Sequence, residues 1–125
     1  MKLLLDTGPL YWWLLGHDRL PARIAKLIAD PGNAVWASAV SFYELHYKTR
    51  LGKLPGQLPN LDTVLQAAAI PILAISGEHA AHAGQLDWDH RDPWDRILAA
   101  QAKLEGCSLV SVDKAFDTAG VERIW

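Results

Sequence analysis

The sequence has little cysteine, no long apolar run and no excess of charge of one sign. Cys107 is the only cysteine in 125 residues, so the chain can form neither an intramolecular disulfide nor a cysteine metal cluster. Asp6 interrupts the N-terminal apolar run too early for a signal peptide. The longest apolar stretch, 67–75, contains Pro71 and is far shorter than the roughly 20 residues of a membrane helix. We therefore expect a cytoplasmic chain that does not span a membrane.

The overall charge and composition narrow the class further. A formal net charge of −2 excludes a generally basic surface that coats nucleic acid, so a polyanion would have to bind at a local patch. Half of the residues are hydrophobic and 21% are charged, which is typical of a globular chain rather than a disordered one. At this length we expect a single domain over residues 1–125.

Short apolar runs alternate with longer helical patterns along the whole sequence. This alternation predicts an α/β fold with a central parallel sheet of four to five strands and helices on both faces. The runs do not alternate between apolar and polar residues, so the strands should be buried on both sides. The expected strands are residues 3–5, 34–37, 72–74, 108–112 and, as a fifth, 121–125.

Several helix boundaries have local signals. Pro9 suits the first position of a helix, and Ser41 with Glu44 three residues later has capping-box spacing. Asp92 directly before a proline predicts the start of the last helix. Residues 54–60, with two prolines and a glycine, predict a loop. The expected helices are 10–15, 22–29, 41–51, 61–69 and 93–105.

Acidic residues follow the ends of these predicted elements. Asp6 and Asp113 come directly after two strands, at the carboxyl edge of the sheet where open parallel sheets bind their ligands. Glu44 and Asp95 fall in the first turns of predicted helices that can begin at the same edge. We therefore expect four carboxylates on one rim.

Four ionised carboxylates in one pocket require a cation. Each pair at about 4 Å repels by roughly 4 kcal/mol at an effective dielectric of 20. Oxygen ligands without cysteine or a close histidine pair favour Mg²⁺ or Mn²⁺ over zinc. Such an ion supports the hydrolysis of phosphodiesters.

Each acidic residue also has a structural interpretation when it is taken alone. Glu44 could be the partner of Ser41 in a capping box, and Asp92 is a good N-cap. Asp95 suits the positive end of a helix dipole, and Asp113 could begin a turn. The joint pattern favours a site.

Four segments in order carry these residues: Leu3–Leu10, Ser38–Leu45, His90–Ala102 and Leu109–Phe116. Together they resemble the motifs of PIN-domain ribonucleases, specifically the VapC-like toxins of bacterial and archaeal toxin–antitoxin pairs. The resemblance runs almost end to end. It implies a Rossmann-like parallel sheet and a metal-dependent ribonuclease toxin that hydrolyses RNA and is neutralised by a small antitoxin. It also implies a homodimer, which would use the apolar run 11–15.

The resemblance assigns roles to individual residues. The acidic quartet that holds one or two Mg²⁺ or Mn²⁺ ions would be Asp6, Glu44, Asp95 and Asp113. The residues that match supporting positions are Thr7, Ser111 and Asp92. Basic residues that flank Glu44 and Asp95 are candidates for phosphate contacts: Lys48, Lys53, Arg91 and Arg96. The antitoxin would cover the rim at Asp6 and Asp95.

Three other classes compete with this interpretation. Asp6-Thr7-Gly8 is also the signature triplet of aspartic proteases, but those are all-β and this chain has helical patterns. A receiver-type signalling domain has similar length and an acidic Mg²⁺ pocket, but the middle of the chain offers only Asp62, inside a helical pattern. A catalytically inactive PIN-like binding module would keep the fold without turnover.

Overall fold

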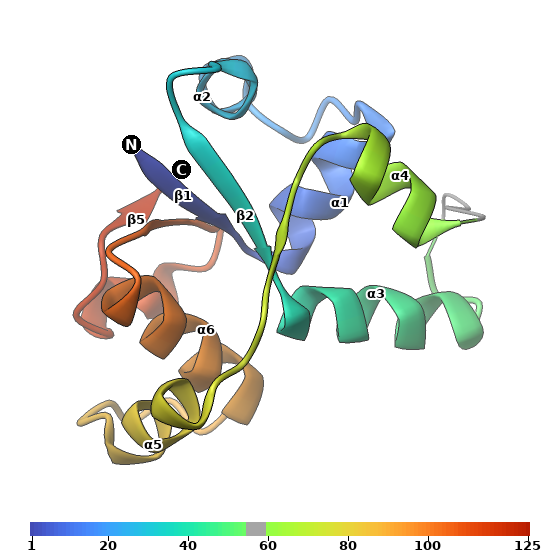
Figure 1. Cartoon of the computed structure of the whole chain (residues 1–125). Helices are drawn as coiled ribbons and strands as arrows, with labels where there is room; N and C mark the ends of the chain where they lie inside the picture. Colours follow the sequence, from blue (N-terminus) through green and yellow to red (C-terminus); the bar gives the residue numbers. More distant parts are fainter. Residues whose placement is uncertain (55–59) are drawn as a thin grey trace.

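A five-stranded parallel sheet forms the centre of the fold (Figure 1). The structure, a computed structural model, describes residues 1–54 and 60–125. The strand order is β3-β2-β1-β4-β5, with every neighbouring pair parallel. The strands are β1 (Lys2–Leu5), β2 (Ala34–Ser38), β3 (Ile72–Leu73), β4 (Ser108–Val110) and β5 (Arg123–Ile124). This confirms the predicted α/β class, including the fifth strand, and excludes the all-β protease.

The register brings the carboxyl ends of three strands level with one another. Leu5 of β1 pairs with Ala37 of β2 on one side and with Val110 of β4 on the other. The next residue of the central strand, Asp6, donates its backbone N–H to the Val110 carbonyl at 3.0 Å. A carboxylate therefore stands at the carboxyl end of the most central strand, where ligand sites of parallel sheets lie.

Both faces of the sheet are covered by helices. Successive residues of β1 point to opposite faces, so each residue shows what packs on its side. Leu3 and Leu5 belong to a core cluster with α1, α2 and α4, whereas Leu4 belongs to a second cluster with α6 and the 3₁₀ helix η1. All three leucines are fully buried, as the unbroken apolar run predicts. The bounds are α1 (Thr7–Leu15), α2 (Ala22–Ala29), α4 (Leu61–Ala67), α6 (Pro93–Leu104) and η1 (Lys114–Thr118).

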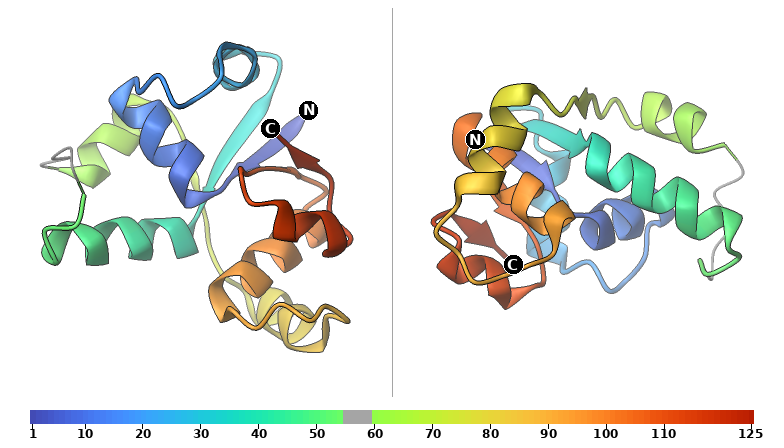
Figure 2. Two further views of the ribbon diagram at one scale, coloured as in Figure 1. Left: turned by 180° about the vertical axis from the view of Figure 1, so that it is seen from behind. Right: turned by 90° about the horizontal axis from the view of Figure 1, so that it is seen from below.

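Two further helices complete the arrangement. The helix α3 (Ala39–Arg50) follows β2 directly and extends from the carboxyl edge of the sheet. The helix α5 (Gly77–Gln85) lies beside α6 in each view of Figures 1 and 2. The helix α5 was not predicted, because its capping box pairs Ser76 with His79 rather than with Glu or Gln. Among the helices of the described residues, none has the length and apolarity to cross a membrane.

Two predicted helix starts are wrong. Asp6 caps α1, so the helix begins at Thr7 and Pro9 is its third residue rather than its first. Ser38 caps α3 by accepting a hydrogen bond from the Val40 backbone N–H, so the Ser41–Glu44 spacing is not a capping box. Glu44 consequently lies in the second turn of α3. Most of the predicted loop 54–60 falls on residues 55–59, which lie outside the described residues.

Candidate functional site

The central carboxylate is held by hydrogen bonds to both of its oxygens. Asp6 Oδ1 accepts from the Thr7 backbone N–H at 2.8 Å, which caps α1. Asp6 Oδ2 accepts from Ser111 Oγ at 2.7 Å. The two bonds come from different elements, one from α1 and one from the segment after β4. They fix the carboxylate at the end of β1 while it remains partly accessible.

Thr7 connects this position to Glu44. Its Oγ1 lies 3.1 Å from Glu44 Oε1 and 2.9 Å from Ser41 Oγ. An ionised carboxylate can only accept, so the single hydroxyl hydrogen of Thr7 goes to Glu44 and the buried Ser41 donates to Thr7. The other Glu44 oxygen lies 3.9 Å from Lys48 Nζ. Ser41 is therefore part of the support of Glu44 and not its capping partner.

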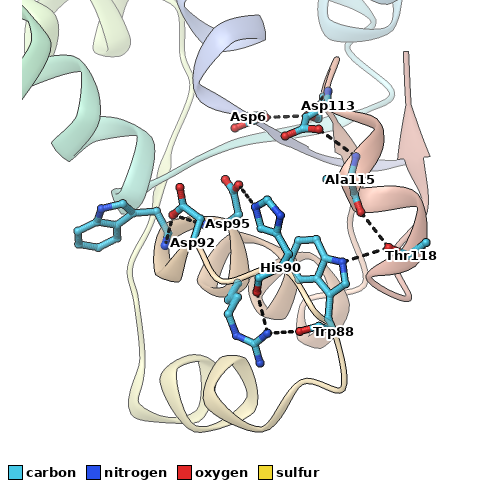
Figure 3. Close-up of polar contacts among 11 residues, drawn as sticks. Asp6, Trp88, His90, Asp92, Asp95, Asp113, Ala115 and Thr118 are labelled. Carbon is cyan, nitrogen blue, oxygen red and sulfur yellow. Dashed lines mark hydrogen bonds and ion pairs between the residues drawn. The ribbon is translucent and has the colours of Figure 1, made fainter.

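Ser111 makes the corresponding connection to Asp113. Its Oγ donates to Asp6 and accepts from the Asp113 backbone N–H at 3.1 Å. Asp113 Oδ1 accepts from the Ala115 backbone N–H at 2.9 Å and so caps η1. The Asp113 side chain is exposed beside Asp6 (Figure 3). Each hydroxyl residue next to Asp6 thus links it to one further carboxylate.

Asp95 lies in the first turn of α6 and points toward the same space as Asp6 (Figure 3). Asp92 caps this helix, because its Oδ1 accepts from the backbone N–H groups of Trp94 and Asp95. Asp95 Oδ2 lies 2.6 Å from His90 Nε2. The His90 ring in turn stacks on Trp88, with ring centroids 4.6 Å apart. The loop residues Trp88 and His90 therefore hold the Asp95 side chain in place.

Burial and mutual repulsion shift the acidity of three of these groups. The pKa of Asp6 is raised from its ordinary value, mainly by burial and further by the charge of Asp113. The pKa of Glu44 is raised by burial and by the charges of Asp6 and Asp95. Burial also raises the pKa of Asp95, with added repulsion from Asp92 and Asp6. The four predicted carboxylates thus lie within one electrostatic neighbourhood centred on Asp6.

The predicted basic residues occupy different environments. Lys48 lies beside Glu44, and its charge lowers the pKa values of Glu44 and Asp6 against the raising effect of burial. Lys53 and Arg91 are exposed. Arg96 donates instead to backbone carbonyls of the segment before α6: Ala83, Leu86, Trp88 and His90. The structure thereby gives Arg96 a role in holding the loop that carries His90.

Two residues that support the site, and a third that joins the elements around it, escaped prediction. His90 contacts Asp95 from five residues upstream, within the segment His90–Ala102 that carries part of the family resemblance. Ser41 supports Thr7. Gln101 is fully buried and joins α6 to the ends of β2 and β3, through Ser38 Oγ and the Ala74 carbonyl. A glutamine among the buried apolar residues of α6 is the signal that could have identified it.

The donor atoms on the rim fit a hard divalent cation, because they are carboxylate and hydroxyl oxygens under mutual repulsion. Within residues 1–54 and 60–125, however, no group of three or more His, Cys, Asp and Glu side chains is arranged so that it could hold a metal ion. Asp95 turns one oxygen to His90, and Asp6 turns one to Ser111. Binding of a shared ion would therefore require rotation of at least one side chain.

Comparison with known proteins bears on the whole chain. The sequence pattern of one family, the PIN domain, matches residues 3–122. A search of curated proteins found no match.

Similar solved structures include VapBC2 from Rickettsia felis bound to a DNA fragment from its promoter, at 20% identity and a TM-score of 0.75, covering 100% of this chain and 99% of that chain. FitAcB from Neisseria gonorrhoeae has 20% identity and a TM-score of 0.70, covering 98% and 96%. A toxin-antitoxin complex from Klebsiella pneumoniae has 21% identity and a TM-score of 0.69, covering 98% and 96%. At these identities the structures establish the shared fold.

Proposed function

We infer the function from the premise that this chain belongs to the PIN domain family. We propose that residues 1–125 act as one PIN-like domain, a metal-dependent endoribonuclease toxin that hydrolyses RNA phosphodiester bonds. The observation that supports this most is the rim on which burial raises the pKa values of Asp6, Glu44 and Asp95, and on which the charges of neighbouring carboxylates raise them further. Buried carboxylates that repel one another make ligands for a cation. The family match also sets aside the receiver-type alternative.

We propose that Asp6, Glu44, Asp95 and Asp113 hold Mg²⁺ or Mn²⁺. A divalent ion in this position would lower the pKa of a water and stabilise negative charge on a phosphate. The oxygen donors and the repulsion between them fit such an ion, as described above.

The residues of the chain would contribute by preorganisation. Thr7 and Ser111 hold Asp6 by both oxygens, so little rotational freedom is lost when a ligand binds there. Thr7 orients Glu44 in the same way. The Lys48 ammonium, beside Glu44, would meet the charge of a phosphate at the rim. The hydrogen bond from His90 orients Asp95 and lowers its pKa against the larger raising effect of burial.

We propose that a small antitoxin covers the rim. The similar VapBC2 and toxin-antitoxin structures are complexes, which supports such a partner. An open depression of about 540 Å³, lined in part by His90 that contacts Asp95, would accept a basic side chain, because two of its lining residues are aspartates. Its lining is Asp87, Trp88, Asp89, His90, Ala115 and Thr118. An arginine that extended from there to Asp95 would compete with metal for that carboxylate.

A homodimer is also proposed, although the structure changes the argument for it. Tyr11 is buried within its own chain, and residues 12–15 pack partly against the same core. Much of the surface of the apolar run is therefore buried within one protomer, which leaves less of it for a dimer interface. Light scattering of the purified chain tests the dimer, and a strict monomer at micromolar concentration would contradict it.

The activity is tested by incubating the purified chain with total cellular RNA, with Mg²⁺ or with EDTA, beside Asp6→Asn. We expect cleavage with Mg²⁺ only, and none by the variant. A second candidate is a catalytically inactive PIN-like binding module. It is favoured by the finding that no three His, Cys, Asp or Glu side chains of the described residues are arranged to hold a metal ion. That candidate predicts RNA binding without cleavage under every metal condition.

A further inference from the structure

Three exposed aromatic side chains form a continuous strip beside the carboxylates. Tyr43 and Tyr47 lie on α3, with ring centroids 5.8 Å apart and ring planes 10° apart. Trp94, in the first turn of α6, lies 5.2 Å from the Tyr43 ring. The three residues are 49%, 47% and 38% exposed. We refer to these three side chains as the aromatic strip.

The aromatic strip is exceptional in this molecule. Among the described residues, the strongly exposed large hydrophobic side chains include three aromatics, and all three belong to the strip. Neither tyrosine is needed to fill the core, since the buried side chains of α3 are Val40, Ser41 and Leu45. Contiguous exposed apolar surface of this kind marks an interaction site.

The two tyrosines of the strip run alongside Glu44 on the same helix. Tyr43 precedes Glu44 and Tyr47 precedes Lys48, and residues four apart lie on one side of a helix. The aromatic pair and the Glu44–Lys48 pair are therefore neighbouring stripes along α3. Trp94 extends the strip across to α6, where it directly precedes Asp95.

The charge around the strip selects the kind of ligand. The last turn of α3 carries Lys48 and Arg50, and the exposed Lys53 follows. The strip thus offers aromatic faces with cations along one end, which is the combination that binds single-stranded nucleic acid by base stacking and phosphate attraction. A purely apolar protein partner would leave Lys48 and Arg50 without a role, and an acidic protein partner would be repelled by Glu44 and Asp95.

We propose that the aromatic strip binds unpaired bases of the RNA substrate next to the phosphate at the rim. This rests on the proposed ribonuclease function and adds to it the surface that would hold the bases. The two tyrosine rings are nearly parallel, so bases stacked against them would share one orientation. Bases inside a duplex have their faces covered and could not use the strip.

The test measures binding separately from cleavage. Asp6→Asn serves as the parent, with fluorescence anisotropy of a labelled 12-nucleotide single-stranded RNA, the same RNA as a duplex, and an abasic oligonucleotide of equal charge. We expect Tyr43→Ala, Tyr47→Ala and Trp94→Ala each to weaken single-strand binding by about 10-fold. Tyr43→Phe keeps the stacking surface and should bind like the parent. Leu104→Ala, an exposed residue at the other end of α6, is the matched control.

The abasic oligonucleotide separates stacking from charge. The alanine variants should bind it as the parent does, because it has phosphates but no bases to stack. Unchanged single-strand binding by all three alanine variants, with native circular dichroism, would overturn the proposal. So would variants that bind RNA normally but release a co-purified partner protein, since the strip would then be a protein interface.

The outcomes also separate this proposal from the proposed function. If the unsubstituted chain cleaves no RNA but single-strand binding depends on the strip, the ribonuclease fails and the strip stands. If the chain cleaves RNA while the strip variants bind and cleave as well as their parents, the strip fails and the ribonuclease stands.

Discussion

His90 Nε2 lies 2.6 Å from Asp95 Oδ2, and this contact ties the loop before α6 to the carboxylate rim. Since an ionised carboxylate only accepts, Nε2 carries the hydrogen. The backbone carbonyl of His90 accepts from Arg96 Nη1 at 3.0 Å, so the residue after Asp95 holds the loop that orients Asp95. The position of the Asp95 carboxylate thus depends on His90, whose own position depends on Arg96, the residue after Asp95.

Removal of the His90 donor should weaken metal binding without unfolding the chain. His90→Phe keeps a ring that can stack on Trp88 but cannot donate to Asp95, whereas His90→Gln keeps a donor and loses the stack. Loss of a hydrogen bond to a metal ligand costs about 10-fold or more in metal affinity. We expect the Mg²⁺ concentration for half-maximal cleavage to rise about 10-fold in His90→Phe and less in His90→Gln. Equal values in both variants would contradict a positioning role.

Substitution of Arg96 should affect stability more than RNA binding. Arg96→Met removes the hydrogen bonds to four backbone carbonyls and should lower the free energy of unfolding by about 2 kcal/mol or more. Arg91→Met is the matched control, because Arg91 is exposed and its loss should change stability by less than about 0.5 kcal/mol. Urea denaturation of both variants measures this. A stable Arg96→Met protein that binds RNA weakly would instead favour the phosphate contact.

The edge of the sheet at which Asp6 and Asp113 lie could be predicted because it depends on topology. Asp6 directly follows β1, and the carboxyl ends of parallel strands meet at one edge whatever the side-chain details. The prediction that Asp113 directly follows its strand is wrong, because β4 ends at Val110. The role of Ser41 could not be predicted, because Ser38 competes for the same cap and local spacing does not show which serine wins. The His90 contact escaped prediction because it depends on a loop held by backbone carbonyls, which have no sequence signature.

The stability of the metal-free protein should fall as the pH rises above about 4. The folded-state pKa values of Asp6, Glu44 and Asp95 are raised above their ordinary values of 3.8, 4.5 and 3.8, mainly by burial. The stabilising contribution of their protonated forms is therefore fully present below those ordinary values and is lost as the pH rises through the raised ones. Unfolding in EDTA across pH 4 to 8 measures it. The triple variant Asp6→Asn, Glu44→Gln, Asp95→Asn should lack this fall in stability with rising pH.

Asp6→Asn should abolish cleavage and leave the fold intact. Asparagine keeps the N-cap of α1 but removes the charge at the centre of the rim. Cleavage should fall by at least about 100-fold, while Tm in EDTA should rise by a few degrees because a destabilised buried charge is gone. Cleavage at the unsubstituted rate would reduce Asp6 to a helix cap. Asp30→Asn, at an exposed aspartate directly after the C-terminal end of α2, is the control and should change neither quantity.

Mg²⁺ or Mn²⁺ should stabilise the fold, and the stabilisation should grow with pH. The ion binds ionised carboxylates, whose fraction increases as the pH rises through their raised pKa values, so protons and metal compete for the same oxygens. A ligand at 100 times its Kd stabilises by about 2.7 kcal/mol, which differential scanning fluorimetry resolves easily. The gain in Tm from 10 mM Mg²⁺ should therefore be larger at pH 8 than at pH 5. The gain in Tm should be small at both pH values in Asp6→Asn, because that variant lacks the carboxylate at the centre of the rim, whose charge acts on both Glu44 and Asp95. A gain that is the same at both pH values and survives in Asp6→Asn would place metal binding elsewhere on the chain.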